Sequence, residues 1–233
     1  MGADARLEEL AGRYGLPAGA ADRLRALLDL VAASPVSLTS VRDVDRAVEV
    51  HVADSLTGLV VDAVRTAGSL ADLGPGAGFP GLVLAIARPE MRVTLVESVG
   101  RKAEFLASAL AALAIPNARV VASRAEDWRE GRATQDVVTA RALAPLTTLV
   151  EYAAPLLTVG GSLVAWKGPA GAGEVADARA AAAATGMSSD IESVDLARGV
   201  AEARTLYVVS KVSSTPAGFP RRAGMARKRP IEA

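Results

Sequence analysis

From residue 69 onward, short apolar runs alternate with segments whose apolar residues recur at helical spacing. Strands are expected at 70–74, 92–97, 118–122, 135–140, 161–166, 190–196 and 205–212, and helices at 80–87, 101–113, 148–157 and 172–184. Alternating strands and helices build a parallel sheet, because each crossover helix returns the chain to the same end of the sheet and covers one face. The sequence therefore predicts an α/β fold with a mostly parallel, seven-stranded sheet.

The two ends of the chain depart from this alternation. No helix is expected between the last two strands, so they are predicted to run antiparallel to each other. An open parallel sheet with an antiparallel strand near its end is the architecture of class I, Rossmann-like methyltransferases, whereas a dinucleotide-binding domain usually continues parallel. Residues 1–66 are expected to form an N-terminal helical extension, 67–212 the methyltransferase domain, and 213–233 a basic tail.

The stretch LADLGPGAGFPGLVLAIA places a glycine-rich turn between the first strand and its helix. Gly76, Gly78 and Gly81 fit the dinucleotide pattern G-x-G-x-x-G, and Glu97 ends the next strand as the acid of that pattern. The same stretch fits D-x-G-x-G-x-G from Asp72, which resembles the S-adenosylmethionine loop of methyltransferases. In both patterns the missing Cβ atoms let a ligand approach the turn, and the later acid accepts hydrogen bonds from ribose hydroxyls.

The charge of the ligand separates the two patterns. A diphosphate needs free backbone N–H groups where the helix starts, and Pro80 removes one of them. S-adenosylmethionine carries an ammonium and a sulfonium instead, and Asp72 supplies a carboxylate at the loop. Ala125 and Glu126 follow the third strand, where this topology places the adenine edge, although an acid there also fits a solvated helix start. S-adenosylmethionine is therefore the expected cofactor, anchored by Asp72 and Glu97.

Cysteine is absent and histidine occurs once, at His51. Disulfides, thiolate metal sites, a cysteine nucleophile and histidine-rich metal sites are thereby excluded, and no metal is expected. The chain has no run of about 18 uncharged apolar residues that could span a bilayer, and acids stand where a signal peptide would need basic residues. A cytoplasmic protein without a membrane partner is expected.

The absence of cysteine and the segment after the fourth strand limit which atom of a nucleic acid can accept the methyl group. Methylation of cytosine C5 normally needs a cysteine nucleophile, and methylation of the adenine amino group typically uses an Asp/Asn-Pro-Pro-aromatic segment after the fourth strand. This chain has ARALAPL there, which offers Arg141, a donor-only side chain that suits the O6 and N7 acceptors of guanine. Guanine N7 carries a lone pair and no proton, so its methylation needs positioning and exclusion of water rather than a general base.

A series of segments together resembles, in order and spacing, the family of bacterial 16S ribosomal RNA guanine-N7 methyltransferase G, also called glucose-inhibited division protein B. These segments are SLTSVRD (37–43), HVADSL (51–56), DLGPGAGFPGLVLAI (72–86), RKAEFL (101–106), SRAEDW (123–128), ARALAPL (140–146), AWKG (165–168) and the PRRAG tail. The resemblance covers nearly the whole chain. It implies a monomeric Rossmann-like enzyme that uses S-adenosylmethionine to methylate one guanine of 16S rRNA, and that prefers ribosomal particles to free RNA.

By position, the resemblance assigns cofactor contacts to Gly74, Phe79, Ala125, Glu126 and Arg141, beside the loop glycines Gly76 and Gly78. Phe79 either covers the adenosine or stacks on the flipped base. The chain departs from the family pattern at Ser37, Pro75 and Glu97, where members often have Asn, Thr and Asp. Serine and glutamate keep the polar or acidic character, so the assignment is unchanged.

Arg141 and Lys167, each at the end of a central strand, are the candidate catalytic residues. Lys167 also fits a surface lysine whose stem lies along apolar neighbours. Three further sites each have two interpretations. His51 is either a packing residue or an RNA contact, and Arg42 with Asp43 either orders a substrate loop or caps a helix. Arg101 and Lys102 are either phosphate contacts or solvated charges.

The tail carries five cations between Arg221 and Arg229. It is expected to be poorly ordered unless bound, and to add salt-dependent phosphate contacts without affecting the affinity for the cofactor. A solvated basic terminus would have the same composition. Two other functions fit the sequence: a nicotinamide-dependent oxidoreductase on the same glycine loop, or a noncatalytic RNA-binding assembly factor that keeps the cofactor as a structural ligand.

Overall fold

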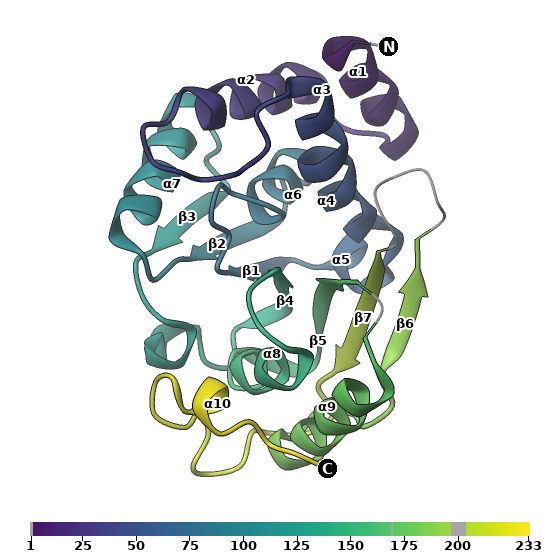
Figure 1. The fold of residues 1–233 in the computed structure, drawn as a ribbon, viewed down its shortest axis with the longest axis vertical. Coiled ribbons are helices and arrows are strands. Elements are labelled where there is room, and N and C mark those ends of the chain that lie inside the picture. The colour runs from purple at the N-terminus through teal and green to yellow at the C-terminus, as the bar shows by residue number, and fades with distance from the viewer. Residues whose placement is uncertain (1, 169, 197–203) are drawn as a thin grey trace.

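A computed structural model describes residues 2–168, 170–196 and 204–233 (Figure 1). Its strands form one sheet in the order β3-β2-β1-β4-β5-β7-β6. The strands are β1 (Ser69–Leu73), β2 (Arg92–Val96), β3 (Ala118–Val121), β4 (Gln135–Arg141), β5 (Leu157–Lys167), β6 (Glu192–Asp195) and β7 (Thr205–Ser210). β1 to β5 pair in parallel, and β7 pairs antiparallel with both β5 and β6. The predicted seven-stranded sheet with one antiparallel strand near the C-terminus is confirmed; residues 197–203 of the expected domain lie outside the described residues.

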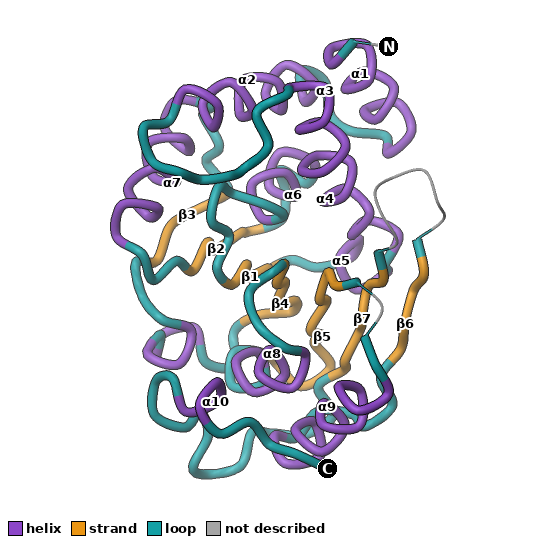
Figure 2. The backbone as a smooth tube through the Cα atoms, viewed as in Figure 1, coloured by secondary structure: helices purple, strands orange, loops and turns teal. Residues whose placement is uncertain are grey.

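Helices cover both faces of this sheet (Figures 1 and 2). α6 (Gly81–Ala87) and α7 (Gly100–Ala112) share one apolar core with the N-terminal helices, whereas α8 (Leu146–Ala153), α9 (Ala172–Thr185) and α10 (Met225–Lys228) lie over the other core. β1 is buried at every residue because it lies at the centre of the sheet between these layers. Strands covered on both faces have continuous rather than alternating apolar sequences, which explains why they could be located from apolar runs.

The N-terminal extension is helical but contains a break that the sequence did not predict. α1 (Ala3–Tyr14) and α2 (Ala20–Ala33) are followed by α3 (Val44–Ala47), a π-helical turn (Val48–Ala53), α4 (Asp54–Leu56), a 3₁₀ turn (Thr57–Val60) and α5 (Asp62–Thr66). Asp43 caps α3 by accepting a 2.7 Å hydrogen bond from the Arg46 amide, as one of its two interpretations predicted. The chain packs tightly at the break, since a Cβ atom on Gly58 would lie 2.6 Å from the Trp166 ring.

The basic tail is ordered, so the expectation of a poorly ordered terminus is wrong. Arg221 Nε donates at 2.7 Å to the carboxylate of Glu151, which is 3 % exposed and lies on α8. Ala226 is 2 % exposed within the α8–α9 core, and the Thr147 hydroxyl donates to the Ile231 carbonyl at 3.0 Å. A buried carboxylate needs a cation, and Arg221 supplies it from the tail. Across the described residues, no helix is long and apolar enough to cross a membrane.

Candidate active site

The glycine turn joins β1 to α6 in a conformation that favours glycine. Gly74, Gly76 and Gly78 have φ values of 64°, 59° and 102°, in the left-handed region. A Cβ atom on Gly74 would lie 2.7 Å from Leu143 Cδ1. The backbone of the turn therefore lies against the loop that follows β4, at the carboxyl edge of the sheet where open α/β folds bind their ligands.

Asp72 lies beneath this turn, not in a ligand pocket. It is 0 % exposed; its Oδ2 accepts a 2.7 Å hydrogen bond from the Gly81 amide, and its Oδ1 accepts one of 3.0 Å from the Thr139 hydroxyl. Burial raises the pKa of this carboxyl to about 7, while the two hydrogen bonds act in the opposite direction. The carboxyl fixes the start of α6 to β1, because a polar group buried there must find its partners inside the fold. Its direct contact with a cofactor ammonium stays a prediction.

Glu97 directly follows β2 and lies beside the turn, as expected for a ribose partner. Its Oε2 accepts a 3.2 Å hydrogen bond from the Gly76 amide, and its Oε1 accepts one of 2.8 Å from the Val99 amide. The side chain is 4 % exposed and holds the glycine turn against the end of β2. A carboxylate offers about four acceptor positions, so two of them are used by the backbone and two are left for hydroxyl groups.

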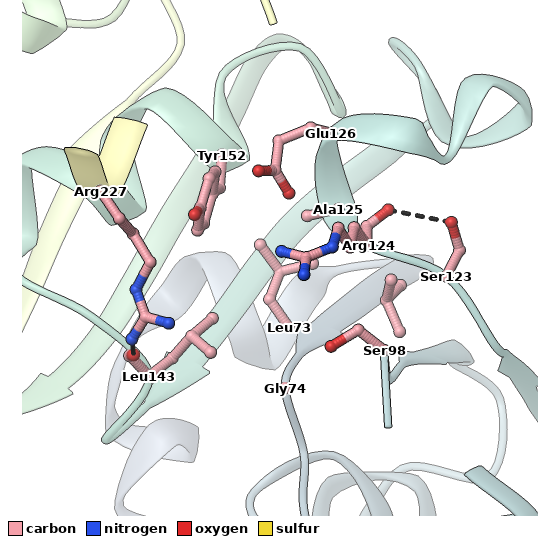
Figure 3. A pocket seen from close by; sticks show the side chains of 11 residues that line it. Leu73, Gly74, Ser98, Ser123, Arg124, Ala125, Glu126, Leu143, Tyr152 and Arg227 are labelled. Atoms are coloured by element: carbon pink, nitrogen blue, oxygen red, sulfur yellow. Dashed lines mark hydrogen bonds between the residues drawn. The ribbon is translucent and has the colours of Figure 1, made fainter. Parts of the chain in front are cut away.

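A pocket of about 80 Å³ opens at the carboxyl ends of β1 to β4 (Figure 3). Its lining residues are Leu73, Gly74, Val96, Ser98, Ser123, Arg124, Ala125, Glu126, Leu143, Tyr152 and Arg227. Gly74, Ala125 and Glu126 were predicted as cofactor contacts, and the structure brings them together here. The other predicted contacts do not line this pocket. Asp72 lies under the glycine turn, Gly76 and Gly78 lie in it, and Phe79, Glu97 and Arg141 lie beside it.

A second cluster joins the glycine turn to the N-terminal extension. Phe79 is 4 % exposed and stacks on His51, with ring centroids 4.5 Å apart. The Arg141 guanidinium lies 5.5 Å from the centroid of the Phe79 ring. Arg141 Nη1 donates to Asp54 Oδ2 at 2.7 Å, and Asp54 is 1 % exposed. His51 Nε2 shares a 2.9 Å hydrogen bond with the Thr39 hydroxyl.

The contacts in this cluster show how His51 and Phe79 are placed. Burial, followed by the charge of Arg141, lowers the pKa of His51 to about 4, so the ring is neutral at pH 7. The packing interpretation of His51 is supported, since its ring is buried, stacked and hydrogen-bonded. Phe79 has one face on His51 and almost no exposed surface, so it is not placed as an open stacking platform for a base.

Lys167 ends β5 as predicted, where its Nζ forms a 2.9 Å ion pair with Glu174 of α9. Glu174 Oε1 also accepts a 2.8 Å hydrogen bond from the Leu146 amide, at the start of α8. The ion pair therefore ties the end of β5 to the loop that follows β4. Lys167 does not line the pocket of Figure 3.

Sequence reasoning missed several residues of the site. Asp54 had a usable signal, because an acid inside the apolar HVADSL helix must find a cation when it is buried. Tyr152 and Arg227 had none, since they reach the pocket from α8 and from the C-terminal segment through tertiary packing. Across the described residues, no group of three or more His, Cys, Asp or Glu side chains is arranged to hold a metal ion.

The strand order, the antiparallel β7 and the glycine turn with an acid after the next strand define a class I methyltransferase. Two solved structures share this fold with TM-scores of 0.51. The antibiotic-resistance methyltransferase Kmr is 21% identical and matches 66% of this chain and 92% of its own. A mutant of the 16S rRNA (adenine(1408)-N(1))-methyltransferase from Catenulisporales acidiphilia is 19% identical and matches 66% and 90%.

The chain belongs to the GidB family, rRNA small subunit methyltransferase G, whose model matches residues 22–201. Ribosomal RNA small subunit methyltransferase G of Roseiflexus castenholzii is 48% identical over 200 residues, which cover 84% of each chain. The protein of the same name from Thermotoga neapolitana is 42% identical over 200 residues, covering 85% of this chain and 86% of its own. The predicted family is confirmed, and the chain is an rRNA methyltransferase.

Proposed function

We propose that the chain transfers a methyl group from S-adenosylmethionine to N7 of a guanine in 16S rRNA within the small ribosomal subunit, and that it works as a cytoplasmic monomer. The observation that carries the proposal is the pocket at the carboxyl ends of β1 to β4, lined by Gly74, Ala125 and Glu126, in a member of this family.

The donors and acceptors around this pocket fit S-adenosylmethionine. Gly74 is one of the lining residues, and its missing Cβ leaves room for the side chain of Leu143, another lining residue. Glu97 has acceptor positions for two ribose hydroxyls, and Ala125 with Glu126 offers a backbone and a carboxylate to the adenine edge. The cofactor, when bound, supplies an electrophilic methyl group on a sulfonium. The residues of the chain position that group and keep water away from it.

Methylation at guanine N7 suits a site without a free general base. The one histidine of the chain is buried behind Phe79 with a lowered pKa, and it is already hydrogen-bonded to Thr39. N7 carries no proton, so its attack on a methyl group requires only a fixed geometry. Arg141 and Lys167 serve as positioning groups for the acceptor side, each held by a carboxylate, Asp54 and Glu174 respectively.

The oxidoreductase alternative has less support from the start of α6. The Gly81 amide donates to Asp72, and the Leu82 amide donates to the Gly78 carbonyl, so these amides are not available to a diphosphate. Equilibrium binding of radiolabelled S-adenosylmethionine and NAD to the purified chain tests this directly. We expect binding of the first alone; binding of NAD alone would support the oxidoreductase.

The central test of the proposal is nucleoside mass spectrometry of 16S rRNA. A deletion strain is expected to lose 7-methylguanosine from 16S rRNA, and the plasmid-borne chain should restore it. The Arg141→Met variant removes the guanidinium and leaves the buried Asp54 without this partner, so it should restore little. An unchanged 7-methylguanosine level in the deletion strain would reject the methyltransferase and leave the assembly-factor alternative.

Two glycines of the turn form a matched pair for testing the cofactor site. Both have left-handed φ values, so alanine at either costs about 1–2 kcal/mol in backbone strain. Only Gly74→Ala adds a Cβ atom against Leu143, a pocket residue, since nothing lies within 4 Å of a Cβ at Gly76. We expect both variants to lose thermal stability, and the S-adenosylmethionine affinity to fall about tenfold for Gly74→Ala but less for Gly76→Ala, whose amide holds Glu97 from within the turn. Equal losses of affinity measured by calorimetry would contradict this geometry.

A further inference from the structure

The C-terminal segment, residues 219–231, is anchored on α8 and then crosses to the mouth of the pocket. Its anchor is the ion pair between Arg221 and the buried carboxylate of Glu151. Ala226 then packs into the core, with its carbonyl accepting a 3.3 Å hydrogen bond from the Thr148 hydroxyl. Figure 1 shows this segment in yellow beside α8. The anchor fixes where the residues between Arg221 and Ile231 can lie.

The segment contacts both sides of the pocket. The Gly224 amide donates a 2.8 Å hydrogen bond to Glu126 Oε1, on the side that follows β3. Arg227 Nη2 donates at 2.9 Å to the Leu143 carbonyl, on the side that follows β4. In Figure 3, Arg227 and Glu126 lie on opposite sides of the pocket, with Tyr152 between them. The segment therefore connects two loops that are 17 residues apart in the chain, 126 to 143.

The contact with Glu126 matters because this carboxylate is one of the two groups offered to the adenine edge. A side chain that orients a ligand gives a higher affinity when it is already fixed in the unbound protein, because binding then does not cost its rotamer freedom. The Arg227 guanidinium closes the side facing Glu126, and a planar guanidinium is suited to cover the face of an aromatic ring.

We propose that the C-terminal segment is a wall of the S-adenosylmethionine pocket: the Gly224 amide orients Glu126, and Arg227 covers the adenine. This inference rests on the proposed function and specifies one part of its cofactor site. It replaces the expectation that removal of the tail would leave the cofactor affinity unchanged. Two cations of the tail have partners in the fold or at the pocket: Arg221 pairs with Glu151, and Arg227, although exposed, lines the pocket and donates to Leu143. Arg222, Lys228 and Arg229 are exposed and do not line the pocket.

The test compares two variants that each remove one positive charge from α10. Arg227→Gln loses the guanidinium at the pocket, whereas Lys228→Gln changes an exposed neighbour that does not line it. We expect Arg227→Gln to weaken binding of both S-adenosylmethionine and adenosine by about 5- to 20-fold, and Lys228→Gln to change them less than about twofold. Isothermal titration calorimetry on the full-length chain gives the affinities, and both variants should unfold within about 2 °C of the parent.

The outcomes separate this inference from the proposed function. If the parent chain binds no S-adenosylmethionine, the proposed function fails first. If the parent binds S-adenosylmethionine and Arg227→Gln binds it as tightly as Lys228→Gln, the proposal that the C-terminal segment is a wall of the pocket is wrong, and the proposed function stands. A loss for S-adenosylmethionine with unchanged adenosine binding would overturn the placement of Arg227 over the adenine. Point variants are preferred to truncation, because removing Arg221 would leave Glu151 buried without its cation.

Discussion

Asp54→Ala is expected to lower the free energy of unfolding by about 3–5 kcal/mol, because it removes one partner of a buried ion pair. Asp54 is 1 % exposed, and its Oδ2 accepts the 2.7 Å hydrogen bond from Arg141. Arg204 Nε lies 3.3 Å from the other carboxylate oxygen. The variant leaves two guanidinium groups facing an apolar methyl, and the Arg141 side chain is only 11 % exposed to water. Urea unfolding followed by circular dichroism measures the change.

Asp29→Ala is the matched control for this prediction. Asp29 also pairs with an arginine, Arg25, at 3.1 Å, but its side chain is 59 % exposed. Pairs of this exposed kind contribute roughly 0–1 kcal/mol, since water screens the charges. Asp54→Asn separates charge from hydrogen bonding, because its amide oxygen still accepts from Arg141, and it should fall between the parent and Asp54→Ala. An Asp54→Ala protein as stable as Asp29→Ala would show that the pair does not hold the extension to β4.

The expected strands and helices between residues 69 and 212 were located by a local signal. β1, β4 and β5 lie inside the sheet with helices on both faces, so their side chains are apolar in continuous runs. The break in the N-terminal helix has no such signal. It coincides with Gly58 lying against Trp166, and with the Trp166 indole donating to the Asp54 carbonyl at 2.9 Å. Contacts between residues more than 100 positions apart cannot be inferred from helical spacing.

The sequence predicted where the site residues lie on the sheet better than it predicted which partners their side chains contact. Strand ends placed Gly74, Ala125, Glu126 and Arg141 at the correct edge of the sheet. The sequence could not indicate that Arg141 points to Asp54, because that partner lies 87 residues earlier in the chain. The same reason applies to the tail, whose cations were assigned to RNA although Arg221 has a buried partner 70 residues away. Charge composition gives the number of cations, and tertiary packing decides which of them are free to bind phosphate.

Asp72→Asn is expected to stabilise the protein by about 4 kcal/mol at pH 8 and to make no such difference near pH 4. Burial raises the pKa of the folded carboxyl from 3.8 to about 7, so the folded state holds a proton that the unfolded chain releases. Stability from this group is therefore complete below pH 4 and is lost as the pH rises toward 7. Asparagine is neutral throughout, and its amide can accept from the Gly81 amide and contact the Thr139 hydroxyl.

Thr139→Val is the control that isolates the charge. It removes the hydrogen bond from Thr139 to Asp72 with little change in volume, but it keeps the buried carboxyl. The difference in stability between this variant and the parent should not vanish at low pH in the way expected for Asp72→Asn, because the titrating group is still present. Urea unfolding of the three proteins from pH 4 to pH 8 gives the comparison. A constant difference between Asp72→Asn and the parent over this range would mean that Asp72 is ionised in the fold, and that the link between β1 and α6 is a charged one.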